Sequence, residues 1–119
     1  MAADSALFVR WNRPIHDRES IALELYSSFV NYLGKQQQMG TIASFEPVLL
    51  ASHGTNLIGF VLVRGSRPAL DKLRDTEDFQ EFIVKGTYML EDYGVVDAYL
   101  GDAMKAQLGR YQKVIVGKH

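Results

Sequence analysis

Cysteine is absent from this chain of 119 residues, which excludes disulfide bonds, thiolate catalysis and metal sites built on cysteine. No apolar run approaches the roughly 20 residues that a membrane-spanning helix needs. An excess of charge is also missing, because 13 basic and 14 acidic residues give a net charge of −1. Such a chain has no strong field to attract phosphate backbones or anionic lipid. We therefore predict no nucleic-acid partner and no membrane partner.

A signal peptide is not visible either, because Met1–Ala6 carries Asp4 and no basic segment ahead of an apolar stretch. We expect a cytoplasmic protein on this ground. The composition, with 47% apolar and 23% charged residues, is that of one folded domain with a single core. We therefore expect one domain spanning residues 1–119.

The segments that are present follow a definite order along the chain. Alternating or continuous apolar runs indicate strands, and apolar residues three and four apart indicate helices. The order strand-helix-strand-strand-helix-strand predicts the α+β, ferredoxin-like βαββαβ fold, a four-stranded antiparallel sheet with its helices on one face. An extra C-terminal helix is predicted from Asp102. The expected segments, in chain order, are Ala6–Asn12, Ser20–Leu33, Ile42–Ala51, Leu57–Arg64, Pro68–Tyr93 and Val95–Leu100.

Several residues mark the ends and breaks of these segments. Gly34 is expected to end the first helix, and Lys35–Gly40 to form a polar loop. Pro47 has no N–H for a ladder, so the second strand should lie at an edge of the sheet. Asp75 and Thr76 read as a break in the second helical stretch. The first helix should bury one face, formed by Ile21, Leu25, Phe29 and Tyr32.

The third strand points to a partner. Leu57–Val63 has no charged or polar side chain, which is typical of a central strand covered on both faces. Two helices on one side leave the other side of the sheet open. We therefore predict a homodimer, the C-terminal segment as cover, or both. The C-terminal helix carries an apolar stripe for packing on its own sheet or on the partner, made of Met104, Leu108, Tyr111 and Ile115.

With this order in view, the chain resembles the dimeric α/β-barrel superfamily, which includes antibiotic-biosynthesis-monooxygenase-like and stress-responsive α/β-barrel proteins. The resemblance rests on the strand order, the apolar Leu57–Val63, the split helix of Arg67–Leu73 and Thr76–Phe82, and the segment Gly94–Tyr99. The resemblance covers about residues 6–100. It implies two sheets packed face to face, with pockets inside the barrel or between sheet and helices. It implies no tightly held cofactor and assigns no catalytic residue, although the superfamily has haem-using branches.

Strand alternation suggests where a site could lie. If Leu7, Val9 and Trp11 face the helices, Phe8 and Arg10 face the barrel. In the fourth strand, Val96, Ala98 and Leu100 suit the helices, which turns Asp97 and Tyr99 the other way. The expected binding residues on the barrel side are Arg10, Asn12, Glu46, Arg64, Asp97 and Tyr99.

Arg10, Asp97 and His53 are the candidate catalytic residues. A carboxylate beside a cation in a covered site is suited to general base work, and arginine can hold an enolate or carboxylate oxygen. The alternative is that the barrel-facing residues only form intersubunit salt bridges and hydrogen bonds. His53 lies at an expected hairpin tip, His16 precedes the first helix and His119 ends the chain.

No metal site and no cofactor are predicted, because paired histidines and a phosphate loop are both missing. Trp11, the single tryptophan, is expected in the core, while Tyr88, Tyr93 and Tyr99 are candidates to line a pocket.

Three functions follow from these features. The first is a small-molecule-binding protein or cofactor-independent enzyme with a pocket in a dimeric barrel, and the second is a non-catalytic dimerisation or regulatory module. The third is RNA binding through Phe8 and Phe60, which the charge balance and the lack of a basic-glycine motif before Phe60 disfavour.

Overall fold

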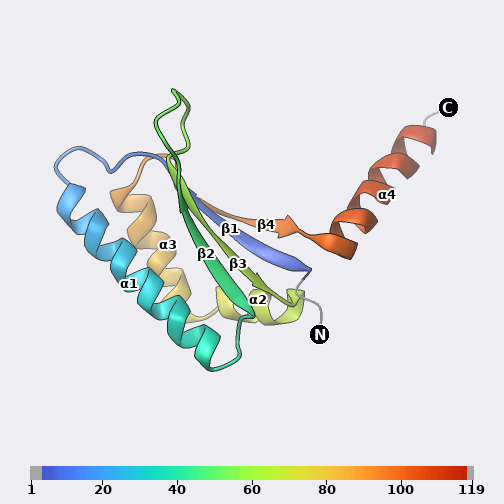
Figure 1. The fold of residues 1–119 in the computed structure, drawn as a ribbon, viewed down its shortest axis with the longest axis horizontal. Helices are drawn as coiled ribbons and strands as arrows, with labels where there is room; N and C mark the ends of the chain where they lie inside the picture. Colours follow the sequence, from blue (N-terminus) through green and yellow to red (C-terminus); the bar gives the residue numbers. More distant parts are fainter. Residues whose placement is uncertain (1–3, 118–119) are drawn as a thin grey trace.

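A computed structural model describes residues 4–117 as a four-stranded sheet with three helices on one face and a fourth helix standing apart (Figure 1). The βαββαβ order is confirmed, and the fold class is α+β with a ferredoxin-like arrangement. No helix in residues 4–117 has the length and apolar character needed to cross a membrane. The elements are β1 (Ser5–Trp11), α1 (Glu19–Gln38), β2 (Ser44–Leu49), β3 (Gly59–Gly65), α2 (Arg67–Arg74), α3 (Glu77–Met89), β4 (Gly94–Tyr99) and α4 (Gly101–Gly117).

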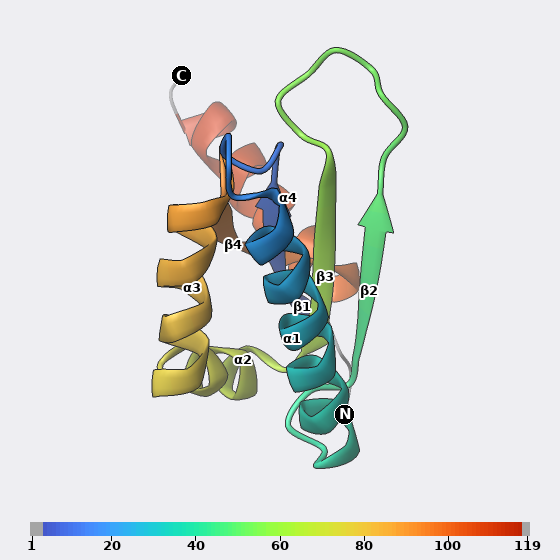
Figure 2. The same cartoon turned by 90° about the vertical axis from the view of Figure 1, so that its left-hand side faces the viewer.

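The sheet has the order β2-β3-β1-β4, with all neighbours antiparallel. β3 therefore lies inside the sheet and β2 lies at its edge, as its sequence and Pro47 predicted. Leu7 pairs with Val63 and Val9 with Val61, so these four side chains share one face. They are almost fully buried, because α1, α2 and α3 cover this face (Figure 2). We call it the helix face, and the opposite side of the sheet the open face.

The core fills the space between the helix face and the three helices. Leu25, Phe29 and Leu33 of α1 pack there with Phe79 of α3, and the rings of Phe29 and Phe79 meet edge to face at 6.0 Å. Ile21 does not belong to this stripe: it is 36% exposed, and Ala22 takes the inward place. The helical period was therefore predicted correctly, but the face was wrong by one residue at both ends, because Leu33 is fully buried and Tyr32 is only partly buried against the core.

The predicted break between α2 and α3 is confirmed. Thr76 is the N-cap of α3, where its hydroxyl accepts a hydrogen bond from the Phe79 N–H at 3.4 Å and donates one to the Leu73 carbonyl at 2.7 Å. This side chain thus satisfies a free donor at the start of α3 and adds a bond to the Leu73 carbonyl, which also accepts from the Thr76 backbone N–H at 3.1 Å.

The predicted end of α1 at Gly34 is wrong, because the helix continues to Gln38. Gly40, with a φ of 79°, is the residue that adopts the left-handed conformation after the helix. Glutamine and lysine favour helices, so most of the segment expected as a polar loop forms the last turns of α1. The C-terminal segment is helical through Val114–Val116.

The expected phase of β4 is also wrong. Val96 pairs with Phe8 and Ala98 with Ala6, which places Val96 and Ala98 on the open face. Val95, Asp97 and Tyr99 pair with Val9, Leu7 and Ser5 and lie on the helix face. Apolar residues occur on both faces of this edge strand, so its apolar pattern alone did not fix which side meets the helices.

Candidate functional site

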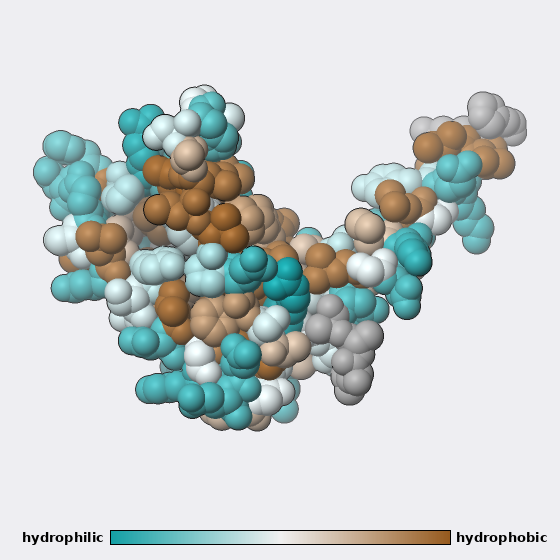
Figure 3. Space-filling model, in the orientation of Figure 1, coloured by the Kyte–Doolittle hydropathy of each residue, from teal (hydrophilic) through white to brown (hydrophobic). Residues whose placement is uncertain are grey.

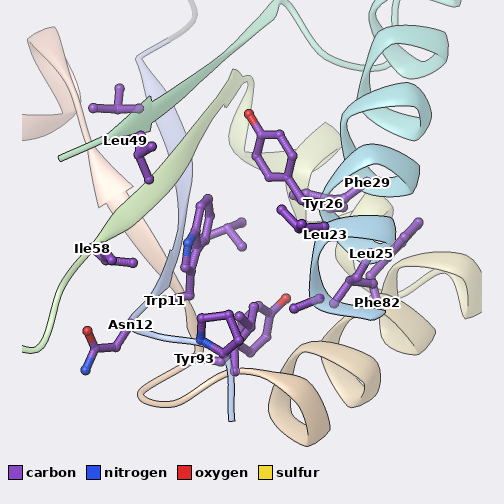
Figure 4. Close-up of a pocket in the computed structure, with 15 residues that line it drawn as sticks. Trp11, Asn12, Leu23, Leu25, Tyr26, Phe29, Leu49, Ile58, Phe82 and Tyr93 are labelled. Carbon is purple, nitrogen blue, oxygen red and sulfur yellow. The ribbon is translucent and has the colours of Figure 1, made fainter. Parts of the chain in front are cut away.

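A cavity lies between the helix face of the sheet and α1, near the end of β1 (Figure 4). Its volume is about 320 Å³, which is at the lower end of the range for small-molecule sites. The walls come from β1, α1, the β2–β3 hairpin, α3 and the segment before β4. The lining includes Trp11, Asn12, Ala22, Tyr26, Leu49 and Tyr93.

Trp11 forms the sheet-side wall of the cavity. It pairs with Gly59 on β3, and a Cβ atom at that position would lie 2.7 Å from Cζ2 of the indole. Gly59 therefore leaves the space in which the large ring lies over the neighbouring strand. Tyr26 of α1 meets Trp11 edge to face at 6.1 Å, and Figure 4 shows the two rings on opposite sides of the cavity. An aromatic molecule in the cavity would find ring surface on both the sheet side and the helix side, next to this contact and not within it.

Tyr93 closes the cavity on the side of α3. It packs against Gly86, where any Cβ atom would overlap the phenol ring. Burial raises the pKa of Tyr93 to about 12, and the nearby Arg74 guanidinium opposes this shift. The phenol therefore stays protonated at neutral pH and can donate a hydrogen bond.

The lining holds few polar groups and no charged side chain among the residues that the structure describes. Asn12 is buried, and its side-chain N–H donates to Asp92 Oδ2 at 3.2 Å. The remaining polar groups of the lining side chains are the hydroxyls of Tyr26 and Tyr93 and the indole N–H of Trp11. Such a lining favours an uncharged, largely apolar molecule, since an ion would lose its hydration without gaining a partner.

The open face holds a different group of predicted site residues. Glu46 and Arg64 form an ion pair, with Oε1 and Nη1 3.2 Å apart. Arg10 shares this face, its Nη2 donates to the Asn56 carbonyl, and its buried Nε has no partner within residues 4–117. Phe8 and Phe60 lie between these charges with ring centroids 4.9 Å apart.

Asp97 and Tyr99 do not join Arg10, contrary to the sequence prediction. Asp97 Oδ1 lies 3.0 Å from Arg67 Nη1 and 3.4 Å from Arg74 Nη1, so α2 supplies its partners on the helix face. Asn12 is also separated from Arg10, because it turns to Asp92 beside the cavity. The set of six expected binding residues is therefore divided among the open face, the cavity and the α2 side of the sheet.

The histidines lie away from the cavity. His53 is exposed in the β2–β3 hairpin loop, where its Nε2 lies 3.1 Å from the Thr55 hydroxyl. His16 is exposed next to Asp17, and His119 is outside the described residues. Within residues 4–117, no three histidine, aspartate or glutamate side chains lie close enough to hold a metal ion. The catalytic candidates Arg10, Asp97 and His53 thus occupy three separate places.

The cavity itself was only partly visible in the sequence. Trp11 was expected as core, and it is a half-buried cavity wall; Tyr93 was a pocket candidate, and it lines the cavity. Tyr26 was missed because it is outside the inward stripe of α1. Its one signal is that a large aromatic residue stands next to that stripe rather than opposite it.

Comparisons with known proteins support the fold and leave the family open. No family model and no curated protein matches the chain. A solved structure from Bacteroides fragilis is similar, with a TM-score of 0.60 and 12% sequence identity over 83% of this chain and 98% of the other. It is described as a dimeric protein of unknown function with a ferredoxin-like fold. This likeness shows that the chain shares the ferredoxin-like fold.

Proposed function

We propose that the protein is a homodimer of the dimeric α/β-barrel type, in which each subunit binds a small apolar molecule between the sheet and α1. The observation that carries the binding function is the cavity of about 320 Å³ with its aromatic walls. Cavities of this kind, mostly apolar with a few polar groups, are typical ligand sites. The binding function does not depend on a metal or a cofactor.

The lining indicates the class of ligand. Trp11 and Tyr26 offer ring surfaces, and the protonated hydroxyl of Tyr93 offers a hydrogen-bond donor. Without a carboxylate, histidine, lysine or arginine in the described lining, general acid–base chemistry has no strong base here. We therefore propose binding of a flat, uncharged, aromatic or partly unsaturated molecule rather than catalysis.

The open face supports the homodimer. Phe60 and Leu62 of the central strand and Phe8 and Val96 beside them form an apolar surface that α1, α2 and α3 do not cover. Within this surface, the side chain of Val96 is 51% exposed. A second copy packed on this surface would remove it from water, as in the superfamily that the sequence resembles. The Bacteroides fragilis protein is described as dimeric, which supports a homodimer here as well.

The single tryptophan allows a direct test of ligand binding. N-phenyl-1-naphthylamine, a neutral aromatic probe, absorbs where tryptophan emits. We expect saturable quenching of Trp11 with matching probe emission. Ala22→Phe places a ring in the cavity and should weaken probe binding at least tenfold, whereas Ser27→Phe, on the exposed side of α1, should leave it within twofold. Equal affinities for both variants, or no saturation with the unmodified protein, would refute the binding site.

A second candidate function is a dimerisation module without a ligand. The Glu46–Arg64 ion pair favours it, because these two residues of the open face already neutralise each other. Under this alternative the protein dimerises, and the probe does not bind saturably. The fluorescence titration therefore separates the two functions.

A further inference from the structure

The last helix of the chain is the least buried part of the molecule. None of the residues of α4 (Gly101–Gly117) is buried, and the helix meets the rest of the chain mainly at β4. Figures 1 and 2 agree that α4 projects to the side of the sheet opposite α1 and α3. It therefore stands beside the open face and not over the core.

This exposure conflicts with the physical chemistry of isolated helices. In proteins most of the stability of a helix comes from packing of its apolar face, and Gly109 near the middle of these 17 residues lowers the intrinsic stability of α4. Four of its large apolar residues share one side, while Val114 and Val116 lie to either side of it. The space-filling view shows apolar surface at intervals along the helix (Figure 3). The stripe consists of Met104 (47% exposed), Leu108 (56%), Tyr111 (62%) and Ile115 (60%). A stripe of this kind requires a surface to pack on.

The dimensions show that the chain itself does not supply that surface. Its radius of gyration is 16.1 Å, compared with about 13.5 Å expected for a compact domain of this length. At 1.5 Å per residue, α4 is about 25 Å long, whereas packed sheets lie about 10 Å apart. α4 starts at the end of β4 and runs out on the open side of the sheet. Because α4 is longer than the distance between two packed sheets, it would extend past the sheet of a second copy packed on the open face.

The area that a stable dimer buries also indicates that α4 packs on a second copy. Four strands spaced by about 4.8 Å, each roughly 20 Å long, give the open face a projected area of only about 400 Å². A stable interface buries about 800 Å² of accessible surface on each partner. A helix about 25 Å long and 10 Å wide adds roughly 250 Å², so α4 is a substantial part of what a stable dimer needs.

We infer that α4 is an exchanged arm: each subunit packs the stripe of Met104, Leu108, Tyr111 and Ile115 against the partner subunit, continuous with the open face. The inference rests on the proposed homodimer. A second copy is the occupant that covers the open face and the stripe together. A lipid surface could accept the stripe, with Lys105, Arg110 and Lys113 turned outward, but it would leave the open face to be covered by something else.

Two single substitutions test the arm, each adding one negative charge to α4. Leu108→Glu places the charge on the stripe and should raise the dimer dissociation constant at least tenfold in sedimentation equilibrium. Ala106→Glu lies on the opposite side of the helix and should leave the constant within twofold. Probe quenching of Trp11 shows that the body of each variant is folded, because the arm does not line the cavity.

The outcomes distinguish the arm from the dimer. A wild-type chain that stays monomeric would overturn the proposed homodimer and the arm with it. A dimeric wild type with an equally strong Leu108→Glu dimer would overturn the arm alone. Wild-type cosedimentation with phosphatidylglycerol–phosphatidylcholine vesicles that Leu108→Glu abolishes, at unchanged dimer affinity, would assign the stripe to a lipid surface instead.

Discussion

At the scale of single residues, two glycines shape the aromatic walls of the cavity. Gly59 leaves room for the Trp11 indole and Gly86 for the Tyr93 phenol. Neither glycine has a positive φ, so the requirement is for space and not for an unusual backbone conformation. Both contacts join residues that a reader of the sequence has no reason to pair.

Gly86→Ala should therefore destabilise the protein although alanine is the better helix former. The added Cβ overlaps the Tyr93 ring, and relieving such overlap costs about 1–3 kcal/mol, more than the gain of about 1 kcal/mol in helix propensity. Gly34→Ala in α1 is the matched control, because nothing lies within 4 Å of its Cβ position. Urea unfolding should show the control slightly stabilised; the same gain at position 86 would contradict the contact.

Tyr93 should make stability depend on pH above 10. Its pKa is raised to about 12 in the fold, compared with 10 in the unfolded chain. The contribution of the Tyr93 phenol to the free energy of unfolding is complete below pH 10. It is lost between pH 10 and 12, because the phenol of the unfolded state releases its proton first. The loss amounts to about 2–3 kcal/mol. In urea unfolding from pH 8 to 11, the free energy of unfolding should fall less steeply with pH for Tyr93→Phe than for wild type. Identical slopes would refute the burial of the phenol.

Asp97 holds α2 to the sheet, and it is not part of the cavity. Asp97→Asn removes the charge that faces Arg67 and Arg74, and all three side chains are partly exposed. We expect a loss of about 0.5–1 kcal/mol of unfolding free energy with unchanged probe affinity. Weaker probe binding at unchanged stability would return Asp97 to the ligand site.

At the scale of elements, the Thr76 hydroxyl contributes to the junction between α2 and α3 from both sides. Thr76→Ala removes both the N-cap of α3 and the hydrogen bond to the Leu73 carbonyl, and should cost about 1 kcal/mol. Thr87→Ala, within α3, loses only a hydroxyl that donates to the Ile83 carbonyl and should be neutral. Thermal unfolding of the two variants checks the cap, and equal melting temperatures would contradict it.

Sequence patterns predicted some features of the strands and helices correctly and others wrongly. The strand order, the edge position of Pro47 and the split at Thr76 followed from local chemistry and are confirmed. The phase of β4 did not, because Val96, Ala98 and Leu100 were expected to face the helices, which assigned Asp97 to the barrel side. Its partners Arg67 and Arg74 come from a separate helix, and only the fold brings them to the strand.

The candidate site was less accessible to sequence reasoning than the fold. Arg10, Glu46 and Arg64 were correctly grouped by strand alternation, but they lie on the open face and not in the cavity. The cavity walls come from β1, α1 and the segment before β4. No local period connects Trp11, Tyr26 and Tyr93, so their meeting depends on tertiary packing.

At the scale of the whole molecule, the open face and α4 leave apolar surface in water on the same side of the sheet. Burial of this surface against a second copy is the central claim, and it has a direct measurement. Sedimentation equilibrium at 1–100 µM should give a mass of twice the 13.4 kDa chain. A mass of 13.4 kDa over the whole range would contradict the account.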